Sequence, residues 1–207
     1  MSRRRAGRRR FVLAWAVSSS ACALWLAPGA RAAFEFSLAP KLPTLTTVKL
    51  NGAGQTVNST MAGFAVIDTR GTKSGWNVTA QGQSGTGKSA VFKQYCPKAK
   101  CGSDSEGYVT GGQTMAANSL KLNSTGASFK GGTGSAPSLQ CAAGCNLDGA
   151  SATKIVSAAA GGAGEATWTT SGFSATSLAL AIATTLRALA NEEVYRVNIL
   201  WTLSTGP

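Results

Sequence analysis

The stretch Trp76-Asn77-Val78-Thr79-Ala80-Gln81 alternates apolar and polar residues, which places its tryptophan, valine and alanine on one face of an extended segment. A second apolar run, Phe64-Ala65-Val66-Ile67-Asp68, lies a short connection upstream. That connection, residues 69–75, contains two glycines and has the composition of a turn. These features predict two β-strands, and a hairpin or an adjacent pair is their simplest arrangement.

The longest alternating run lies close to the end of the sequence. Tyr195-Arg196-Val197-Asn198-Ile199-Leu200-Trp201-Thr202-Leu203 places five large apolar residues on one face, which predicts a long half-buried strand. Shorter alternating runs at 165–169 and 178–182 predict two more strands. By contrast, Leu186–Glu193 has local helical character, enough for about two turns.

These runs predict one domain over residues 33–207, folded as an all-β antiparallel sandwich with a short helical piece. Such a length is sufficient for a real hydrophobic core. Residues 82–163 contain only short β-like pieces between loops rich in glycine, serine and threonine. We therefore expect residues 82–163 to form a loop-rich insertion or extra strands of the sandwich.

Residues 1–32 have the order of parts of a secretory signal peptide. Six arginines precede the apolar run Phe11–Leu26, and Ala30-Arg31-Ala32 forms a cleavage site of small residues. The apolar run is shorter than the roughly 20 residues that span a bilayer, which favours an export signal over an anchor. Arg8-Arg9-Arg10-Phe11-Val12 also fits a twin-arginine signal, so the export route stays open. We expect cleavage after Ala32, no membrane span after cleavage, and a secreted protein.

Most of the formal net charge of +12 belongs to this N-terminal segment. Seven of the ten arginines lie within residues 1–32, and the rest of the chain has 13 basic and 8 acidic residues, a net charge of +5. A nucleic-acid-binding protein would keep its basic patch in the folded domain, so we expect no nucleic-acid partner. The absence of histidine excludes Ser-His-Asp and Cys-His catalysis and any metal site with histidine ligands. We expect no catalytic residue, no metal and no cofactor.

Four cysteines follow the expected cleavage site, and an even number in an exported chain favours disulfides. Their spacing suggests two local bridges, Cys96–Cys101 and Cys141–Cys145, although four cysteines allow three connectivities. A zinc site built from all four thiolates is the alternative, but the usual C-x2-C spacing is absent. The sequence therefore favours disulfides without fixing their pairing.

The segment Gly82-Gln83-Ser84-Gly85-Thr86-Gly87-Lys88-Ser89 matches the pattern of a phosphate-binding loop letter for letter. A loop of that kind joins a strand to a helix, and Ala90–Cys96 is too short for such a helix before Pro97. Chance matches are also more frequent in a chain so rich in glycine and serine. We therefore expect an ordinary glycine-rich loop and no nucleotide ligand.

Two segments of the chain together resemble a known family. Asp68-Thr69-Arg70-Gly71…Gly75-Trp76-Asn77-Val78 resembles the Asp-x-Arg-Gly…Gly-Trp-x-Leu segment of WxL-domain proteins. Tyr195…Trp201-Thr202-Leu203…Pro207 resembles their second Trp-x-Leu motif, with a tyrosine upstream and a proline shortly after it. The resemblance covers about residues 44–81 and 165–207, and Val78 stands where the family has leucine.

The resemblance implies a secreted surface protein of Gram-positive bacteria that attaches non-covalently to the cell wall through peptidoglycan. Carried over by position, the ligand-binding residues are Trp76, Val78, Trp201 and Leu203, with Asp68, Arg70 and Tyr195 in supporting roles. Alternation alone makes a different prediction, since it favours both tryptophans as core aromatics that hold two strands together. The remaining charge of +5 would attract anionic wall polymers, and salt would screen this attraction.

Two other functions stay open at this stage. The domain could dock on another surface protein by strand addition or through an aromatic groove. A glycan hydrolase that depends on paired carboxylates is the remaining enzymatic possibility, although no pair stands out among the eight acidic residues.

Overall fold

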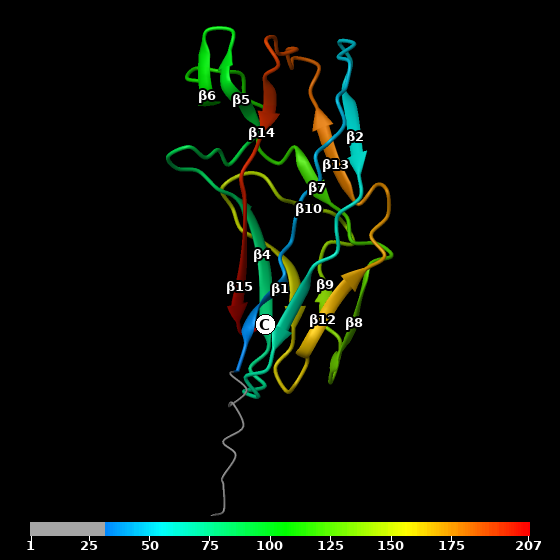
Figure 1. Cartoon of the computed structure of the whole chain (residues 1–207). Coiled ribbons are helices and arrows are strands. Elements are labelled where there is room, and N and C mark those ends of the chain that lie inside the picture. The colour runs from blue at the N-terminus through cyan, green and yellow to red at the C-terminus, as the bar shows by residue number, and fades with distance from the viewer. Residues whose placement is uncertain (1–31) are drawn as a thin grey trace, which may run out of the picture. The chain divides into compact units, whose positions relative to one another are not determined.

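The computed structural model describes residues 32–207, so the expected signal peptide lies outside the described residues except for Ala32. Over this range the chain forms fifteen strands and no helix (Figure 1). The strands are β1 (Phe34–Leu38), β2 (Gln55–Ser59), β3 (Ala65–Asp68), β4 (Trp76–Gly82), β5 (Lys93–Cys101), β6 (Asp104–Tyr108), β7 (Leu120–Leu122), β8 (Ser128–Thr133), β9 (Ser138–Leu139), β10 (Cys145–Asn146), β11 (Thr153–Ala158), β12 (Glu165–Ser171), β13 (Leu178–Ile182), β14 (Val194–Arg196) and β15 (Ile199–Thr205).

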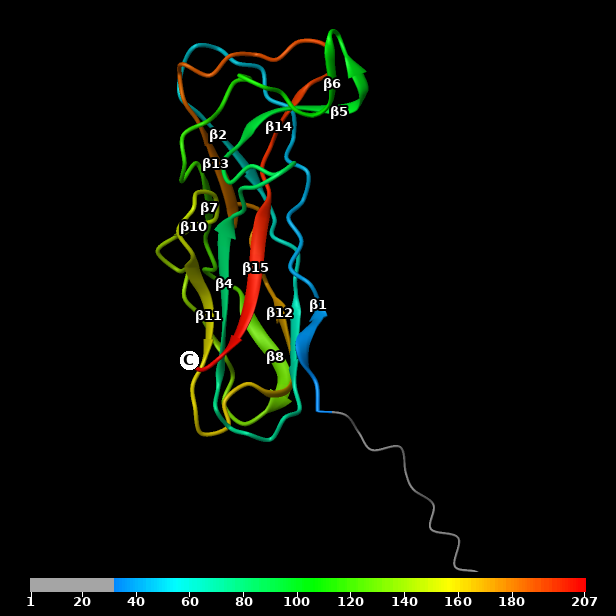
Figure 2. The same ribbon diagram turned by 90° about the vertical axis from the view of Figure 1, so that its left-hand side faces the viewer.

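The strands assemble into four sheets in which neighbours pair antiparallel. Their strand orders are β1-β3-β12-β8 in sheet A, β10-β7-β13-β2 in sheet B, β15-β4-β11-β9 in sheet C and β14-β5-β6 in sheet D. Figure 2 shows sheets A and C together at one end of residues 32–207 and sheet D at the other, with sheet B between them. The predicted all-β antiparallel fold is confirmed.

Sheets A and C form the two layers of a sandwich, and aromatic side chains fill the space between them. Trp76 of β4 meets Phe129 of β8 edge to face, with ring centroids 6.4 Å apart. Phe64, just before β3, contacts Phe129 at 6.1 Å and Trp201 of β15 at 6.3 Å. These contacts join strands from both sheets into one apolar core.

Strand β4 follows the alternation of its sequence closely. Trp76, Val78 and Ala80 are fully buried, whereas the residues between them are half-buried on the outer face. Two glycines with positive φ lie close to this strand. A Cβ on Gly164 would lie 2.5 Å from the indole nitrogen of Trp76, so the tryptophan fits only because this position lacks a side chain. A Cβ on Gly75 would overlap the carbonyl oxygen of Ala158, so this glycine allows the backbone before β4 to approach the end of β11.

The expected pairing between the runs at 64–68 and 76–81 is wrong, although both runs are strands. Strand β3 pairs with β1 and β12 in sheet A, whereas β4 pairs with β11 and β15 in sheet C. The connection 69–75 therefore crosses from one layer to the other. This arrangement lets Val66 and Val78, both fully buried, enter the core from opposite sides.

The C-terminal run is two strands and not one. Strand β14 pairs with β5 in sheet D, and β15 pairs with β4 in sheet C. The break falls at Val197 and Asn198, where the Asn198 side-chain oxygen accepts hydrogen bonds from the Ser89 amide at 3.2 Å and the Tyr108 hydroxyl at 2.6 Å. Alternation survives across a break of this kind, so it could not reveal the change of sheet.

The expected helical piece at Leu186–Glu193 is also wrong. The segment is irregular, with turns closed by hydrogen bonds from Leu186 N to Ala183 O and from Glu193 N to Ala190 O. Asn191 and Glu192 have positive φ, which a helix does not allow. Tertiary contacts explain the difference, because Leu186 packs against the core.

Residues 82–163 contribute strands to all four sheets, since they contain β5 to β11. Most of these strands therefore pair with strands from the rest of the chain. The β5–β6 hairpin forms a separate sheet, sheet D, together with β14 (Figure 1). Both disulfides suggested by spacing are confirmed. Cys96–Cys101 closes the hairpin and Cys141–Cys145 lies against the core, with Cα atoms 5.7 and 5.1 Å apart.

Candidate functional site

The two tryptophan motifs lie side by side on neighbouring antiparallel strands. In the register of β4 with β15, Val78 is opposite Leu203, and Ala80 is opposite Trp201. Because paired residues share a face, both tryptophans and their partners point toward sheet A. The fold thus brings together two motifs that are 125 positions apart in the sequence.

The two apolar residues of the first motif are entirely inside the protein. Trp76 and Val78 each have 0% of their surface exposed. The indole nitrogen of Trp76 donates a hydrogen bond to the carbonyl oxygen of Gly164 at 3.0 Å, which satisfies its one polar group. In this structure Trp76 and Val78 offer no surface to a ligand, and their contribution is to the core.

The second motif reaches the surface because β15 is an edge strand of sheet C. Trp201 and Leu203 point inward like their neighbours on β4, but no strand lies beyond them, and both remain half-buried. The Trp201 ring is held on its inner side by Phe64. An aromatic ring anchored on one side and open on the other is suited to recognition.

Strand β1 forms the corresponding edge of sheet A and lies on the same side of the sandwich as β15 (Figures 1 and 2). It carries Phe34 and Phe36, which are both half-buried against the core. We call the four side chains Phe34, Phe36, Trp201 and Leu203 the apolar margin. Leu38, at the end of β1, extends the exposed apolar surface, with 53% of its area accessible.

Asp68 and Arg70 hold β1 to the turn that precedes Trp76. The Arg70 guanidinium donates to both carboxylate oxygens of Asp68, at 2.9 and 2.8 Å, and lies 3.5 Å from the centre of the Phe34 ring. Hydrogen bonding by Arg70 lowers the pKa of the Asp68 carboxyl below its ordinary value, against the opposing effect of burial. The pair therefore positions one aromatic ring of the apolar margin.

The lowered pKa also bears on the hydrolase alternative. A general acid in glycan hydrolysis needs a carboxyl group whose pKa is raised, so that it is protonated near neutral pH. Asp68 has the opposite shift and both of its oxygens are engaged by Arg70. Its geometry is that of a structural ion pair.

Tyr195 is not brought to the apolar margin. It lies on β14 in sheet D, where its hydroxyl donates to the carbonyl oxygen of Arg187 at 2.8 Å. Burial raises the pKa of this hydroxyl group. Its contact is with the irregular segment that replaces the predicted helix, so its supporting role is local to that segment.

The loop that matches the phosphate-binding pattern joins two strands. It leaves β4, turns at Gly85–Lys88 and continues toward β5, with no helix after it among the described residues. Ser89 is buried, and its hydroxyl donates to the carbonyl oxygen of Val91 at 2.7 Å. The segment therefore lacks the strand–loop–helix geometry that cradles phosphate groups.

Other chemistry-bearing groups do not gather into a second polar centre within residues 32–207. No cluster of three or more His, Cys, Asp or Glu side chains in this range could hold a metal ion. Asp148 is buried, and its carboxylate accepts hydrogen bonds from the amides of Ser119 and Leu120, at 3.1 and 2.8 Å. Burial raises the pKa of Asp148 despite these bonds. The same range holds no helix long and apolar enough to cross a membrane.

Phe34 and Phe36 were not predicted from the sequence as site residues. A signal was present, because Phe34-Glu35-Phe36 alternates immediately after the expected cleavage site. Three residues are too short a run to predict a strand without the partner strand β3.

The fold is that of a β-sandwich domain that carries half-buried aromatic side chains on two of its edge strands. The sequence model of one family, described as WxL domain surface cell wall-binding, matches residues 39–207. The chain belongs to this family, which gives it a role in cell-wall binding at the cell surface. No curated protein and no solved structure matches the chain significantly.

Proposed function

We propose that this domain attaches to the cell wall by binding peptidoglycan non-covalently through the apolar margin. The observation that carries the proposal is the half-buried Trp201 on the edge strand β15, on the same side of the sandwich as the phenylalanines of the other edge strand, β1. Aromatic faces and aliphatic groups of this kind pack against the apolar faces of sugar rings and against peptide side chains.

The two motifs have different roles in this proposal. Trp201 and Leu203 contact the ligand. Trp76 and Val78 anchor β4 in the core, and β4 holds β15 in place through the hydrogen bonds of the sheet. Asp68 and Arg70 fix Phe34. The charge of +5 on residues 33–207 adds a general attraction to anionic wall polymers.

Co-sedimentation of the mature domain with purified cell walls and with purified peptidoglycan tests the proposal. We expect Trp201→Ala to reduce the bound fraction strongly, because it removes the largest ring of the apolar margin while leaving the buried Trp76 in place. Tyr95→Ala is the matched control, since Tyr95 is also half-buried and aromatic but lies in sheet D. Equal binding by folded Trp201→Ala and wild type would refute the proposal.

A second function has one specific observation in its favour. Strand β15 spans seven residues and pairs on one side only, with β4, so a partner strand could add to its free edge. Pull-down from a detergent-extracted envelope after digestion of the wall separates the two functions. A partner protein that stays bound without wall material, and that a peptide able to pair with the free edge of β15 releases, would favour docking on a surface protein.

A further inference from the structure

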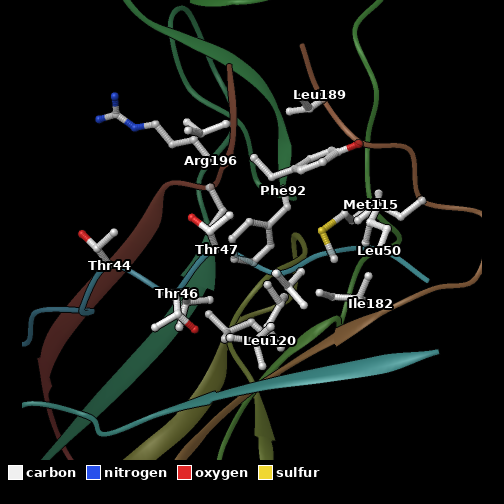
Figure 3. Close-up of a pocket in the computed structure, with 18 of the residues that line it drawn as sticks. Thr44, Thr46, Thr47, Leu50, Phe92, Met115, Leu120, Ile182, Leu189 and Arg196 are labelled. Atoms are coloured by element: carbon white, nitrogen blue, oxygen red, sulfur yellow. The ribbon is translucent and has the colours of Figure 1, made fainter. Parts of the chain in front are cut away.

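A second apolar site lies away from the apolar margin. A cavity of about 790 Å³ opens between sheet B and two irregular segments, 42–50 and 186–193 (Figure 3). Its volume falls in the range of small-molecule binding sites. None of the four residues of the apolar margin lines it.

The inner part of the cavity is hydrocarbon. Figure 3 shows Phe92, Met115, Leu120 and Ile182 converging on it from different strands and loops. These side chains are almost completely buried, and Leu120 and Ile182 belong to β7 and β13 of sheet B. The ligand part that enters this region must therefore be apolar, because a polar group there would find no partner.

Polar groups are confined to the rim. Thr44, Thr46 and Thr47 lie along one side in Figure 3, and Arg187 and Arg196 line the part formed by residues 186–197. Arg196 lies with its guanidinium directed away from the apolar centre, above the ring of Tyr95 at 4.4 Å. A ligand with an apolar tail and a polar head matches this division.

The charges on the rim indicate the charge of the head. Glu193 is the one acidic residue that lines the cavity, and one of its carboxylate oxygens accepts a hydrogen bond from Gln94 at 2.8 Å, whereas the other is enclosed by the protein. The two arginines of the rim outnumber this single acid and favour a negative charge on the head.

We propose that this cavity binds a single acyl chain that carries an anionic headgroup, as in a lysophosphatidylglycerol. The tail occupies the hydrocarbon interior, and the phosphate lies at the rim, toward Arg187 and Arg196. The irregular segments 42–50 and 186–193 have no strand ladder and form the walls of the entrance. The site is independent of the proposed wall-binding site.

The first test is calorimetric titration of the mature domain with lysophosphatidylglycerols of increasing chain length, below their micellar concentrations. Affinity rises about fourfold for each methylene that enters the cavity, until the tail fills it. The zwitterionic lysophosphatidylcholine of the same chain length binds several-fold more weakly. Equal affinity for all chain lengths, or no binding by the monomeric lipids, would contradict the proposal.

Variants locate the site. Val48→Trp fills the cavity from an irregular segment that tolerates a larger side chain, and it weakens lipid binding at least about tenfold. Leu38→Trp is the control, because Leu38 lies on β1 outside the cavity. Arg187→Glu combined with Arg196→Glu removes the preference for the anionic head, whereas Lys154→Glu on β11 preserves it. Unchanged binding by Val48→Trp would overturn the proposal.

Two further measurements distinguish lipid binding in this cavity from adsorption to a membrane surface and from binding at the apolar margin. Binding to phosphatidylglycerol vesicles without binding to the monomeric lipid would show attraction to a membrane surface and would overturn the proposal. Trp201→Ala retains lipid binding, and Val48→Trp retains binding to walls. Failure of one site therefore leaves the other measurable.

Discussion

Trp76 shows at the residue scale why a motif residue need not touch a ligand. Its ring packs against Phe129 and Gly164, and its one polar atom is satisfied by the Gly164 carbonyl. Trp201 has the same residue type and the same inward direction, but lies on an edge strand. Position in the sheet, and not the motif, decides which tryptophan is accessible.

This difference predicts unequal costs for the two alanine substitutions. Trp76→Ala leaves a cavity in the core and lowers the free energy of unfolding by about 3–5 kcal/mol. Trp201→Ala removes a half-buried ring and costs about 1–2 kcal/mol. Urea unfolding of each variant measures both values, and equal losses would contradict the assignment of Trp76 to the core and Trp201 to the surface.

The Asp68–Arg70 pair predicts a specific dependence of stability on pH. Because the pKa of Asp68 is lowered from 3.8 in the folded protein, its stabilisation is present above pH 3.8 and is lost as pH falls through the folded pKa. Asp148 acts in the opposite sense, since its pKa is raised and its contribution is lost as pH rises from 3.8 through the folded pKa. Asp68→Asn should lower the free energy of unfolding by about 1–2 kcal/mol at neutral pH and by much less at acidic pH.

Chemical denaturation between acidic and neutral pH checks this prediction. Asp148→Asn is a useful comparison, because it removes the contribution of opposite sign and leaves the Arg70 contact intact. A difference between Asp68→Asn and wild type that stays constant down to the lowest pH would argue against the ion pair as its source.

At the scale of elements, local pattern predicted strands well and their partners poorly. The alternation of residues 76–81 identified β4 and its buried face, because side-chain direction in a strand depends only on neighbouring residues. Whether β3 and β4 share a sheet depends on residues 69–75 and on strands from distant parts of the chain. The break between β14 and β15 at Asn198 likewise depends on Ser89 and Tyr108, which lie far from Asn198 in the sequence.

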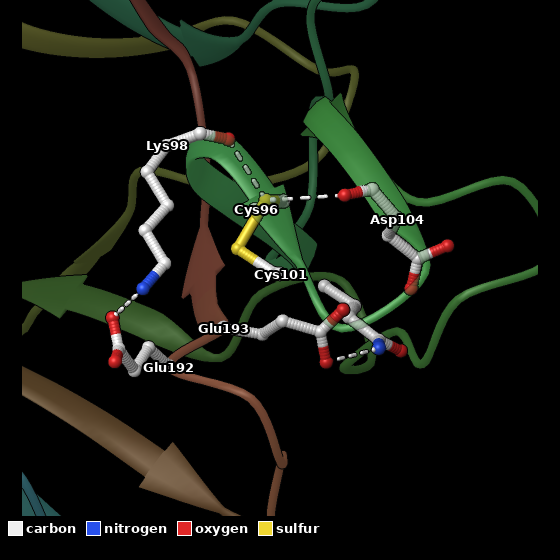
Figure 4. Close-up of a disulfide and its surroundings, with 7 residues drawn as sticks. Cys96, Lys98, Cys101, Asp104, Glu192 and Glu193 are labelled. Atoms are coloured by element: carbon white, nitrogen blue, oxygen red, sulfur yellow. Dashed lines mark hydrogen bonds and ion pairs between the residues drawn. A yellow bond between two sulfur atoms is a disulfide. The ribbon is translucent and has the colours of Figure 1, made fainter.

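The disulfide of the β5–β6 hairpin should make a modest contribution to stability. Figure 4 shows the Cys96–Cys101 bridge beside Lys98, which forms an ion pair with Glu192 of the irregular segment. The closed loop is short, so Cys96→Ala with Cys101→Ala should cost about 2 kcal/mol of stability. Wall binding should remain, because sheet D is separate from the apolar margin.

The corresponding double substitution of Cys141 and Cys145 should cost more, since both residues pack in the main hydrophobic core, whereas Cys96 and Cys101 are buried outside it. Thermal unfolding of the two double variants makes the comparison. Thiol titration of the mature protein without reductant should detect no free thiol. A larger loss for the Cys96–Cys101 pair would contradict the ranking.

At the scale of the whole molecule, the order of the strands explains where the apolar margin lies, whereas composition and charge do not predict its position. The apolar margin exists because β1 and β15 are both outer strands on the same side of the sandwich, a property of topology. The motifs indicated Trp201 and Leu203, but not Phe34 and Phe36, which come from the other layer. The net charge supports only a general attraction to the wall.

The balance of apolar and electrostatic contributions can be measured through salt. A net charge of +5 without a basic cluster should give a weak dependence, so raising the salt to about 0.5 M should reduce wall binding by less than about tenfold. Sedimentation with purified walls across a salt series measures this. Complete release at that salt concentration would indicate attachment driven mainly by charge.

Fluorescence quenching by acrylamide tests the central claim most directly. Residues 32–207 contain three tryptophans, of which Trp76 and Trp168 are buried and Trp201 is half-buried. Soluble peptidoglycan fragments should reduce quenching in the wild type by covering Trp201, and should leave quenching unchanged in Trp201→Phe. Fragments that bind the wild type without protecting any tryptophan would contradict the assignment of wall binding to the apolar margin.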